Sequence, residues 1–322
     1  MNEAKPFERR SFERRGGGPG RKPGLAFALG GGVARGWAHI GVMKAVDERD
    51  LPVRMVAGTS IGALVGGCYM AGKLDELETF ALSLTRRRLL GFLDISLRGS
   101  GLITGIKLAE RMEDHLDDIL IENIPGSLVC VAAEITTGHE IWLSSGSLID
   151  AIRASYALPG IFEPIELDGR VLVDGAIVNP VPVSPCRAYE CPVVIAVNLA
   201  SEQYGRGAVV RTTRPRNVGT ALDATKGQLA VPAKTIWRSL FGERGSTIGI
   251  TGVMMEAFNI IQDRITRSRL AGDPPDLTLS PDVQAIGLAD FHRAEECIEI
   301  GYNATMAQME KLEAAAEASL RV

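Results

Sequence analysis

Short, continuous apolar runs alternate along the chain with segments whose apolar residues recur at helical spacing. The runs that match buried strands in length and residue type are Leu25–Leu29, 53–57, 127–135 and 192–198. The segments that read as helices are 61–71, 148–156 and 248–270. Strands that alternate with helices are typical of a sheet with helices layered against it. The pattern therefore predicts an α/β fold.

Shorter signals complete this outline. Two apolar segments, 162–167 and 170–173, flank Asp168-Gly169, a pair that favours the tight turn of a β-hairpin. The segment 276–279 indicates one more short strand, and 291–320 indicates a single charged helix at the C-terminus. The segment 74–122 reads as helical but irregular. The signal is weaker over 201–247, where a loop and then one amphipathic helix at 229–241 are expected.

Composition narrows the class of protein. The chain of 322 residues is 46% hydrophobic and 23% charged, as in an ordinary globular protein, and its net charge of -4 argues against general binding of nucleic acid. Five scattered cysteines form no disulfide pattern, which favours a reducing compartment. No uncharged apolar run approaches the ~18 residues of a membrane-spanning helix. We expect a cytoplasmic protein, with peripheral contact at the inner membrane left open.

Two basic segments bear on that contact. Residues 1–23 combine arginines with glycine and proline, lack the apolar region of a secretory signal, and are expected to form a disordered tail ahead of a domain at 24–322. The tail is either simply solvated or a basic arm for an anionic membrane surface. Residues 85–93 mix arginines with apolar residues and fit either a solvated helix face or a lid that faces lipid.

A candidate nucleophile follows the second strand. Gly58, Ser60 and Gly62 have the G-x-S-x-G spacing of a sharp strand-to-helix turn that exposes a serine hydroxyl. The glycines leave room for that turn, and the N-terminus of the next helix favours negative charge beside Ser60. The motif alone occurs by chance, so it needs support from other segments.

A glycine turn follows the first strand. Backbone N–H groups of Gly30, Gly31 and Gly32 can turn toward a phosphate or toward the oxyanion of an acyl-transfer intermediate. A dinucleotide site would need G-x-G-x-x-G and an acidic residue at the end of the next strand, where this chain has the Ser60 turn instead. This favours the oxyanion. Small residues on the two following helices, at 34, 38 and 41 and at 62 and 66, suggest that these helices pack closely and fix the turn.

Several separated blocks resemble the patatin-like phospholipases, specifically the small bacterial branch of that family. The matching blocks are 30–42, 58–62, 154–164 and 174–176, with further support from 286–291. The resemblance covers 25–200 well and is scattered over the C-terminal helical part at 205–322. It implies a three-layer α/β/α fold around a central, mostly parallel sheet.

The resemblance also implies a lipid acyl hydrolase, either a phospholipase A or an esterase, that uses a Ser-Asp dyad through an acyl-enzyme. Ser60 would be the nucleophile and Asp174 the base. A free carboxylate is a weak base toward a serine hydroxyl, so Asp174 must be desolvated and held within hydrogen-bonding reach. The substrate would be a lipid or fatty-acyl ester, and an apolar lining is expected from 85–103 and 230–260.

The remaining site residues come from the same blocks. Gly31, Gly32 and Val33 would supply the oxyanion hole, with Gly31 and Gly32 favoured because many relatives carry glycine at the position of Val33. Arg35 would either add positive charge near the oxyanion or anchor the loop by ion pairing, and anchoring is favoured. The residues that complete the matching motifs are Gly30, Arg35, Gly36, Gly58, Gly62, Gly175 and Ala176. No spacing typical of a metal site is present, and no cofactor is expected.

Alternatives remain open at this stage. A Ser-His-Asp triad would draw its base from His292, whereas His39 fits a packing or hydrogen-bonding role inside its block. The same dyad would also serve a thioesterase or a short-chain carboxylesterase. A regulatory relative without activity would keep the fold and lose the chemistry.

Overall fold

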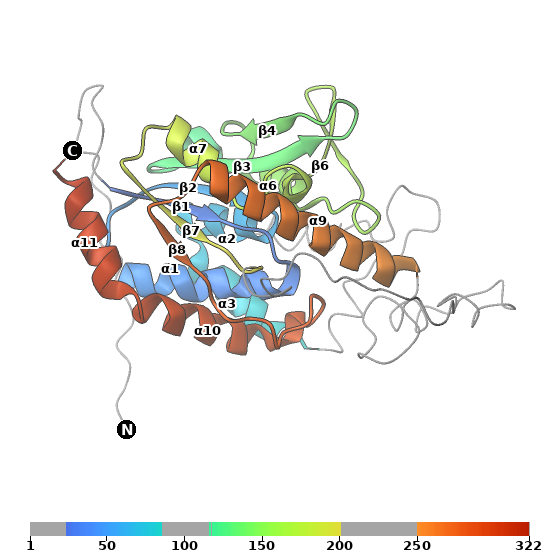
Figure 1. The fold of residues 1–322 in the computed structure, drawn as a ribbon. Helices are drawn as coiled ribbons and strands as arrows, with labels where there is room; N and C mark the ends of the chain where they lie inside the picture. Colours follow the sequence, from blue (N-terminus) through green and yellow to red (C-terminus); the bar gives the residue numbers. More distant parts are fainter. Residues whose placement is uncertain (1–23, 86–115, 117, 201–249, 322) are drawn as a thin grey trace, which may run out of the picture.

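The computed structural model describes residues 24–85, 116, 118–200 and 250–321. Within these ranges, one sheet of eight strands has helices packed on both faces (Figure 1). The strands are β1 (Leu25–Leu29), β2 (Val53–Thr59), β3 (Ser127–Glu134), β4 (Glu140–Leu143), β5 (Ile165–Leu167), β6 (Arg170–Asp174), β7 (Val193–Val197) and β8 (Leu277–Leu279). The α-helices are α1 (Ala38–Glu48), α2 (Ile61–Met70), α3 (Leu74–Ser83), α6 (Leu148–Tyr156), α7 (Val183–Ala188), α9 (Ile250–Gly272), α10 (Ala294–Met306) and α11 (Met309–Ser319). The 3-10 helices are η1 (Val33–Trp37), η2 (Ile121–Asn123), η3 (Gly175–Ile177) and η5 (Phe291–Arg293).

The sheet order is β5-β6-β3-β2-β1-β7-β8, and β4 also pairs with β3. β1, β2, β3, β7 and β8 pair in parallel, whereas β4, β5 and β6 join the sheet through antiparallel pairs. The predicted α/β fold with a central, mostly parallel sheet is therefore confirmed. The predicted hairpin is also present, because β5 and β6 flank Asp168 and Gly169, both at positive φ as a tight hairpin turn requires.

The sheet has a core on each face, which makes the fold three-layered. Leu25, Phe27 and Leu29 of β1 point into the core beneath α1, α2 and α10, while Ala26 and Ala28 point into the core beneath α7. Figure 1 shows α1, α3 and α10 on one side of the sheet and α7 and α9 on the other. A strand that is buried on both faces is continuously apolar, which explains the apolar run of β1.

The strand register brings together the segments that carry the candidate chemistry. Leu29 pairs with Gly58, so the glycine turn after β1 lies beside the serine turn after β2. On the next strand, Thr59 pairs with Val131, and the following residue of β3, Ala132, pairs with Asp174. Residues 60 and 174 thus meet at one edge of the sheet although 114 positions separate them.

Two sequence expectations are wrong in detail. The segment 291–320 forms α10 and α11 rather than one helix, because α10 packs along α1 while α11 turns to bury Leu312 and Ala316 in the core beside β1 and β7. The small face of α1 also meets α10 rather than α2, since a Cβ on Gly41 would meet the backbone of Ile298. α2 instead places Gly62 against the carbonyl group of Leu29, directly below the glycine turn.

Three segments named above lie outside the described residues. They are the tail at 1–23, all but the first residue of the basic cluster at 85–93, and the segment at 201–249. The expectations attached to them remain predictions. None of the helices that the structure describes combines the length and the apolarity needed to cross a bilayer.

Candidate active site

Ser60 occupies the sharp turn between β2 and α2. Its φ of 58° and ψ of -125° lie in a region that costs a non-glycine residue about 1–3 kcal/mol. Gly58 and Gly62 make the turn feasible, because a Cβ on Gly58 would meet the backbone of Gly62 and Ala63. Gly36 and Gly175 also allow close contacts. A Cβ on Gly36 would meet the side chain of Ile61, and a Cβ on Gly175 would meet the carbonyl group of Val131. The G-x-S-x-G spacing therefore reflects backbone crowding around the serine.

Ser155 of α6 holds this strained turn in place. The backbone N–H of Ser60 donates to Ser155 Oγ over 2.9 Å, and Ser155 Oγ donates to the carbonyl group of Val131 over 2.6 Å. Ser155 is fully buried, so its hydroxyl satisfies one donor and one acceptor that lie out of reach of water. Ser155 lies within the block 154–164 that resembles the family, and the sequence alone indicates no role for it. Nothing in the local pattern indicates a contact across 95 positions.

The Ser60 hydroxyl meets a carboxylate. Ser60 Oγ donates to Asp174 Oδ2 over 2.6 Å, and the backbone N–H of Ala176 donates to the other carboxylate oxygen over 2.8 Å. The backbone N–H of Asp174 in turn donates to the carbonyl group of Ala157. The exposed fraction is 8% for Ser60 and 2% for Asp174. The two residues proposed as a dyad from the sequence are thus in direct contact.

Burial changes the acidity of Asp174. Desolvation raises the pKa of its carboxyl group from 3.8 to about 7, against the opposing effect of the hydrogen bonds from Ser60 and Ala176. A base whose pKa lies near neutrality accepts a proton far more readily than an exposed aspartate does. The carboxylate is therefore suited to take the Ser60 proton at neutral pH.

The glycine turn lies against Ser60, but its N–H groups are not equivalent. A Cβ added to Gly31 would lie 3.6 Å from Ser60 Cβ. Gly30 donates to the carbonyl group of Val197, and Gly31 donates to that of Pro180 over 2.9 Å. For Gly32 and Val33, no acceptor is present among residues 24–85, 116, 118–200 and 250–321. This differs from the sequence expectation, which favoured Gly31 over Val33 as an oxyanion donor.

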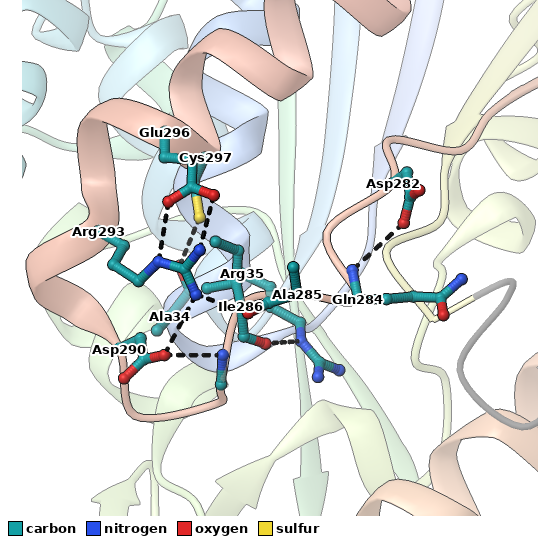
Figure 2. Close-up of polar contacts among 11 residues, drawn as sticks. Ala34, Arg35, Asp282, Gln284, Ala285, Ile286, Asp290, Arg293, Glu296 and Cys297 are labelled. Atoms are coloured by element: carbon teal, nitrogen blue, oxygen red, sulfur yellow. Dashed lines mark hydrogen bonds and ion pairs between the residues drawn. The ribbon is translucent and has the colours of Figure 1, made fainter.

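Val33 has an unusual conformation that the following loop secures. Its φ of 51° is rare for a β-branched residue. The next two residues are fixed to the loop before η5: the Ala34 N–H donates to the carbonyl group of Leu288 over 3.1 Å, and Arg35 Nε donates to that of Ile286 over 2.8 Å. Figure 2 shows Arg35 reaching this loop. Arg35 therefore anchors the turn through a carbonyl oxygen, whereas the sequence expectation was anchoring by ion pairing.

The same loop is itself tied to α10. Arg293 donates to the carbonyl group of Ala285 and forms ion pairs with Asp290 and Glu296 (Figure 2). Asp290 also accepts from the N–H of Gly287. The segment 286–291 that supported the family resemblance thus acts as a brace behind η1.

In the described part of the chain, the Asp174 carboxylate accepts hydrogen bonds from Ser60 and Ala176, and the histidines named from the sequence have other positions. His39 is fully buried, its pKa is lowered by burial to about 4, and its Nε2–H donates to the carbonyl group of Gly30 over 2.7 Å. It therefore positions the glycine turn as a neutral imidazole. His139 is exposed and contacts Thr137, and His292 lies in η5. Within the described ranges, no cluster of three or more His, Cys, Asp or Glu residues is placed to hold a metal ion.

Comparison with known proteins finds a matching family model and several relatives. The family model described as patatin-like phospholipase matches residues 27–187. An uncharacterised NTE family protein of Mycobacterium tuberculosis is 33% identical over 321 residues, covering 87% of this chain and 89% of the relative. The chain belongs to the patatin-like phospholipase family. The matched region includes Ser60, Ser155 and Asp174 and ends before α9.

A further relative and a solved structure with some likeness were also found. Lysophospholipase NTE1 of Kluyveromyces lactis is 28% identical over 286 residues, which span 86% of this chain and 18% of that protein. Among solved structures, VipD from Legionella pneumophila aligns with a TM-score of 0.45 and 14% identity over 91% of this chain and 67% of VipD. A structural likeness of that degree supports no inference about function.

Proposed function

We propose that this protein is a lipid acyl hydrolase in which Ser60 is the nucleophile and Asp174 is the general base. The observation that carries the proposal is the 2.6 Å hydrogen bond from Ser60 Oγ to a buried carboxylate whose pKa is raised to about 7. Membership of the patatin-like phospholipase family supports lipid hydrolase activity. The lysophospholipase relative makes a lysophospholipid the first substrate to test.

The reaction would proceed through an acyl-enzyme. Asp174 takes the Ser60 proton while Ser60 Oγ attacks the acyl carbon, and the resulting oxyanion accepts hydrogen bonds from the N–H groups of Gly32 and Val33. The C–O bond to the leaving alcohol then breaks, and Asp174 returns the proton to that alcohol. In the second half, Asp174 takes a proton from water, which attacks the acyl carbon. The fatty acid leaves as Ser60 recovers its proton.

Two features stabilise the developing negative charge in this scheme. One oxyanion donor typically contributes ~3 kcal/mol to transition-state stabilisation. The N-terminus of α2 begins at Ile61, directly after Ser60, and its dipole favours an anion at that point. The brace formed by Leu288 and Ile286 keeps Gly32 and Val33 fixed, so the donors need little rearrangement as the charge forms.

The deciding experiment compares wild type with Ser60→Ala on lysophospholipid and on p-nitrophenyl esters. We expect release of fatty acid by wild type and loss of that activity in Ser60→Ala. Ser280→Ala, which changes an exposed serine beyond β8, is the matched control and should keep full activity. Preference for thioesters or short esters would favour the alternative enzymes with the same dyad. Absence of hydrolysis by wild type would favour a regulatory relative.

We also propose a cytoplasmic location, which the scattered cysteines favour, with peripheral contact at an anionic membrane, which the basic residues at 1–23 support. Deletion of residues 1–22 should weaken binding to vesicles that contain anionic lipid. Unchanged binding would remove the tail from the proposal.

A further inference from the structure

An apolar pocket lies between the segment that follows α6 and the N-terminal half of α9. Its volume is about 230 Å³. Residues 158–161 form one wall, and Met254, Ala257, Phe258 and Ile261 form the other. Because every side chain in the two walls is apolar, the pocket suits a hydrocarbon ligand.

The pocket wall formed by residues 158–161 begins one residue from a contact with the backbone of Asp174. Leu158 directly follows Ala157, whose carbonyl group accepts the backbone N–H of Asp174 over 2.9 Å. A ligand that enters along this wall therefore starts within one residue of the Asp174 backbone.

The residue that follows the α9 wall of the pocket lies near the glycine turn beside Ser60. Ile261 is followed by Gln262, whose Oε1 lies 3.7 Å from the position of a Cβ on Gly31, and that position is 3.6 Å from Ser60 Cβ. The two walls are far apart in sequence, yet each is followed or preceded by a residue that lies close to Ser60 or to the backbone of Asp174. α9 also packs against η3, which follows Asp174 directly.

The two sides of α9 differ in polarity. Its buried face is polar and carries Asn259, Asp263 and Thr266. Asn259 is only 7% exposed, and its Nδ2 has no hydrogen-bond partner within the described part of the chain. The pocket side of the same helix is apolar. The apolar side of α9 is therefore the side that can contact a hydrocarbon chain.

We propose that this pocket binds the acyl chain of the ester that Ser60 cleaves. The inference rests on the proposed function and adds the site that sets chain-length preference. A volume of about 230 Å³ is below the ~300–1,000 Å³ of pockets for drug-sized ligands, so the pocket takes part of a single chain. Each buried methylene favours binding by ~fourfold, so longer chains gain until the pocket is full.

The preference would be a property of this chain rather than of the family motif. The matched family region ends at residue 187, whereas one wall of the pocket comes from residues 254–261. Relatives that share the dyad but differ in α9 would then differ in the chain length they accept.

The test measures kcat/KM for p-nitrophenyl esters from acetate to palmitate. The kcat/KM of wild type should rise with the length of the acyl chain and then level off. Ala257→Leu fills the pocket and should lower kcat/KM by about tenfold or more for the long esters, while acetate changes by less than about twofold. Phe258→Ala enlarges the pocket and should move the plateau to longer chains.

The matched control is Ala271→Leu, the same enlargement at an exposed position near the other end of α9, and it should leave the profile unchanged. The proposal is overturned if Ala257→Leu lowers kcat/KM equally for esters of all chain lengths, or if it leaves the dependence of kcat/KM on chain length as in wild type. Failure of the proposed function gives a different result, because wild type and Ser60→Ala would then not differ on any ester.

Discussion

Replacing Asp174 with asparagine should abolish hydrolysis and, at alkaline pH, stabilise the protein. The amide has nearly the same size and can keep both hydrogen bonds, since its oxygen accepts from the N–H of Ala176 and its NH₂ donates to Ser60 Oγ. It cannot accept the Ser60 proton, so no acyl-enzyme forms. Stability rises because a buried negative charge has been removed.

The magnitude follows from the acidity of Asp174. Burial raises its pKa from 3.8 to about 7, so the folded protein binds a proton more tightly than the unfolded chain does. Between these two pH values the folded state holds more protons, and the free energy of unfolding of wild type therefore falls as pH rises. Above pH 7 the full effect corresponds to about 4 kcal/mol. The asparagine variant does not incur this loss.

The assay is urea unfolding of wild type and Asp174→Asn at pH 4 and at pH 8. The difference in free energy of unfolding should be small at pH 4 and should grow to several kcal/mol in favour of the variant at pH 8. Asp282→Asn, which removes an exposed carboxylate, is the control and should show no comparable growth. A stability difference for Asp174→Asn that is the same at both pH values would refute the reasoning.

Three further predictions concern the same site. The kcat/KM of wild type should rise with pH through an apparent pKa near 7, because Asp174 must be ionised to act, and a flat profile from pH 5 to 9 would contradict this. Ser155→Ala should cost about 1–3 kcal/mol in urea unfolding and lower kcat while KM stays unchanged, because the Ser60 N–H loses its acceptor; full kcat would exclude the positioning role. Val33→Gly should keep kcat within about twofold and raise the free energy of unfolding by about 1 kcal/mol, since it relieves a positive φ; a loss of stability would contradict that strain.

The parts of the site that the sequence predicts well are those set by local backbone demands. A serine between Gly58 and Gly62 marks a crowded turn whatever surrounds it, and the apolar run of β1 marks a strand buried on both faces. Asp174 lies at the end of β6 just before η3, a local arrangement that a short motif can encode.

The features that the sequence does not predict depend on contacts between distant segments. The hydroxyl of Ser155 reaches Ser60 only because α6 packs beside β3, and the Gly31 N–H is occupied only because Pro180 crosses the end of β1. The break between α10 and α11 is marked by neither glycine nor proline. It follows from the different surfaces that the two helices cover. The periodic pattern of 248–270 predicts α9 as a helix, whereas its place beside the dyad follows from tertiary packing.

The central claim is that the Ser60 hydroxyl, activated by Asp174, becomes the covalent nucleophile. The most direct measurement is mass spectrometry of the intact protein and its peptides after reaction with an alkyl fluorophosphonate, in which the serine oxygen displaces fluoride from phosphorus. We predict one adduct, located on Ser60, that is absent from Ser60→Ala and forms far more slowly in Asp174→Asn. A wild-type protein that hydrolyses lipid esters yet carries no adduct on Ser60 would contradict the account.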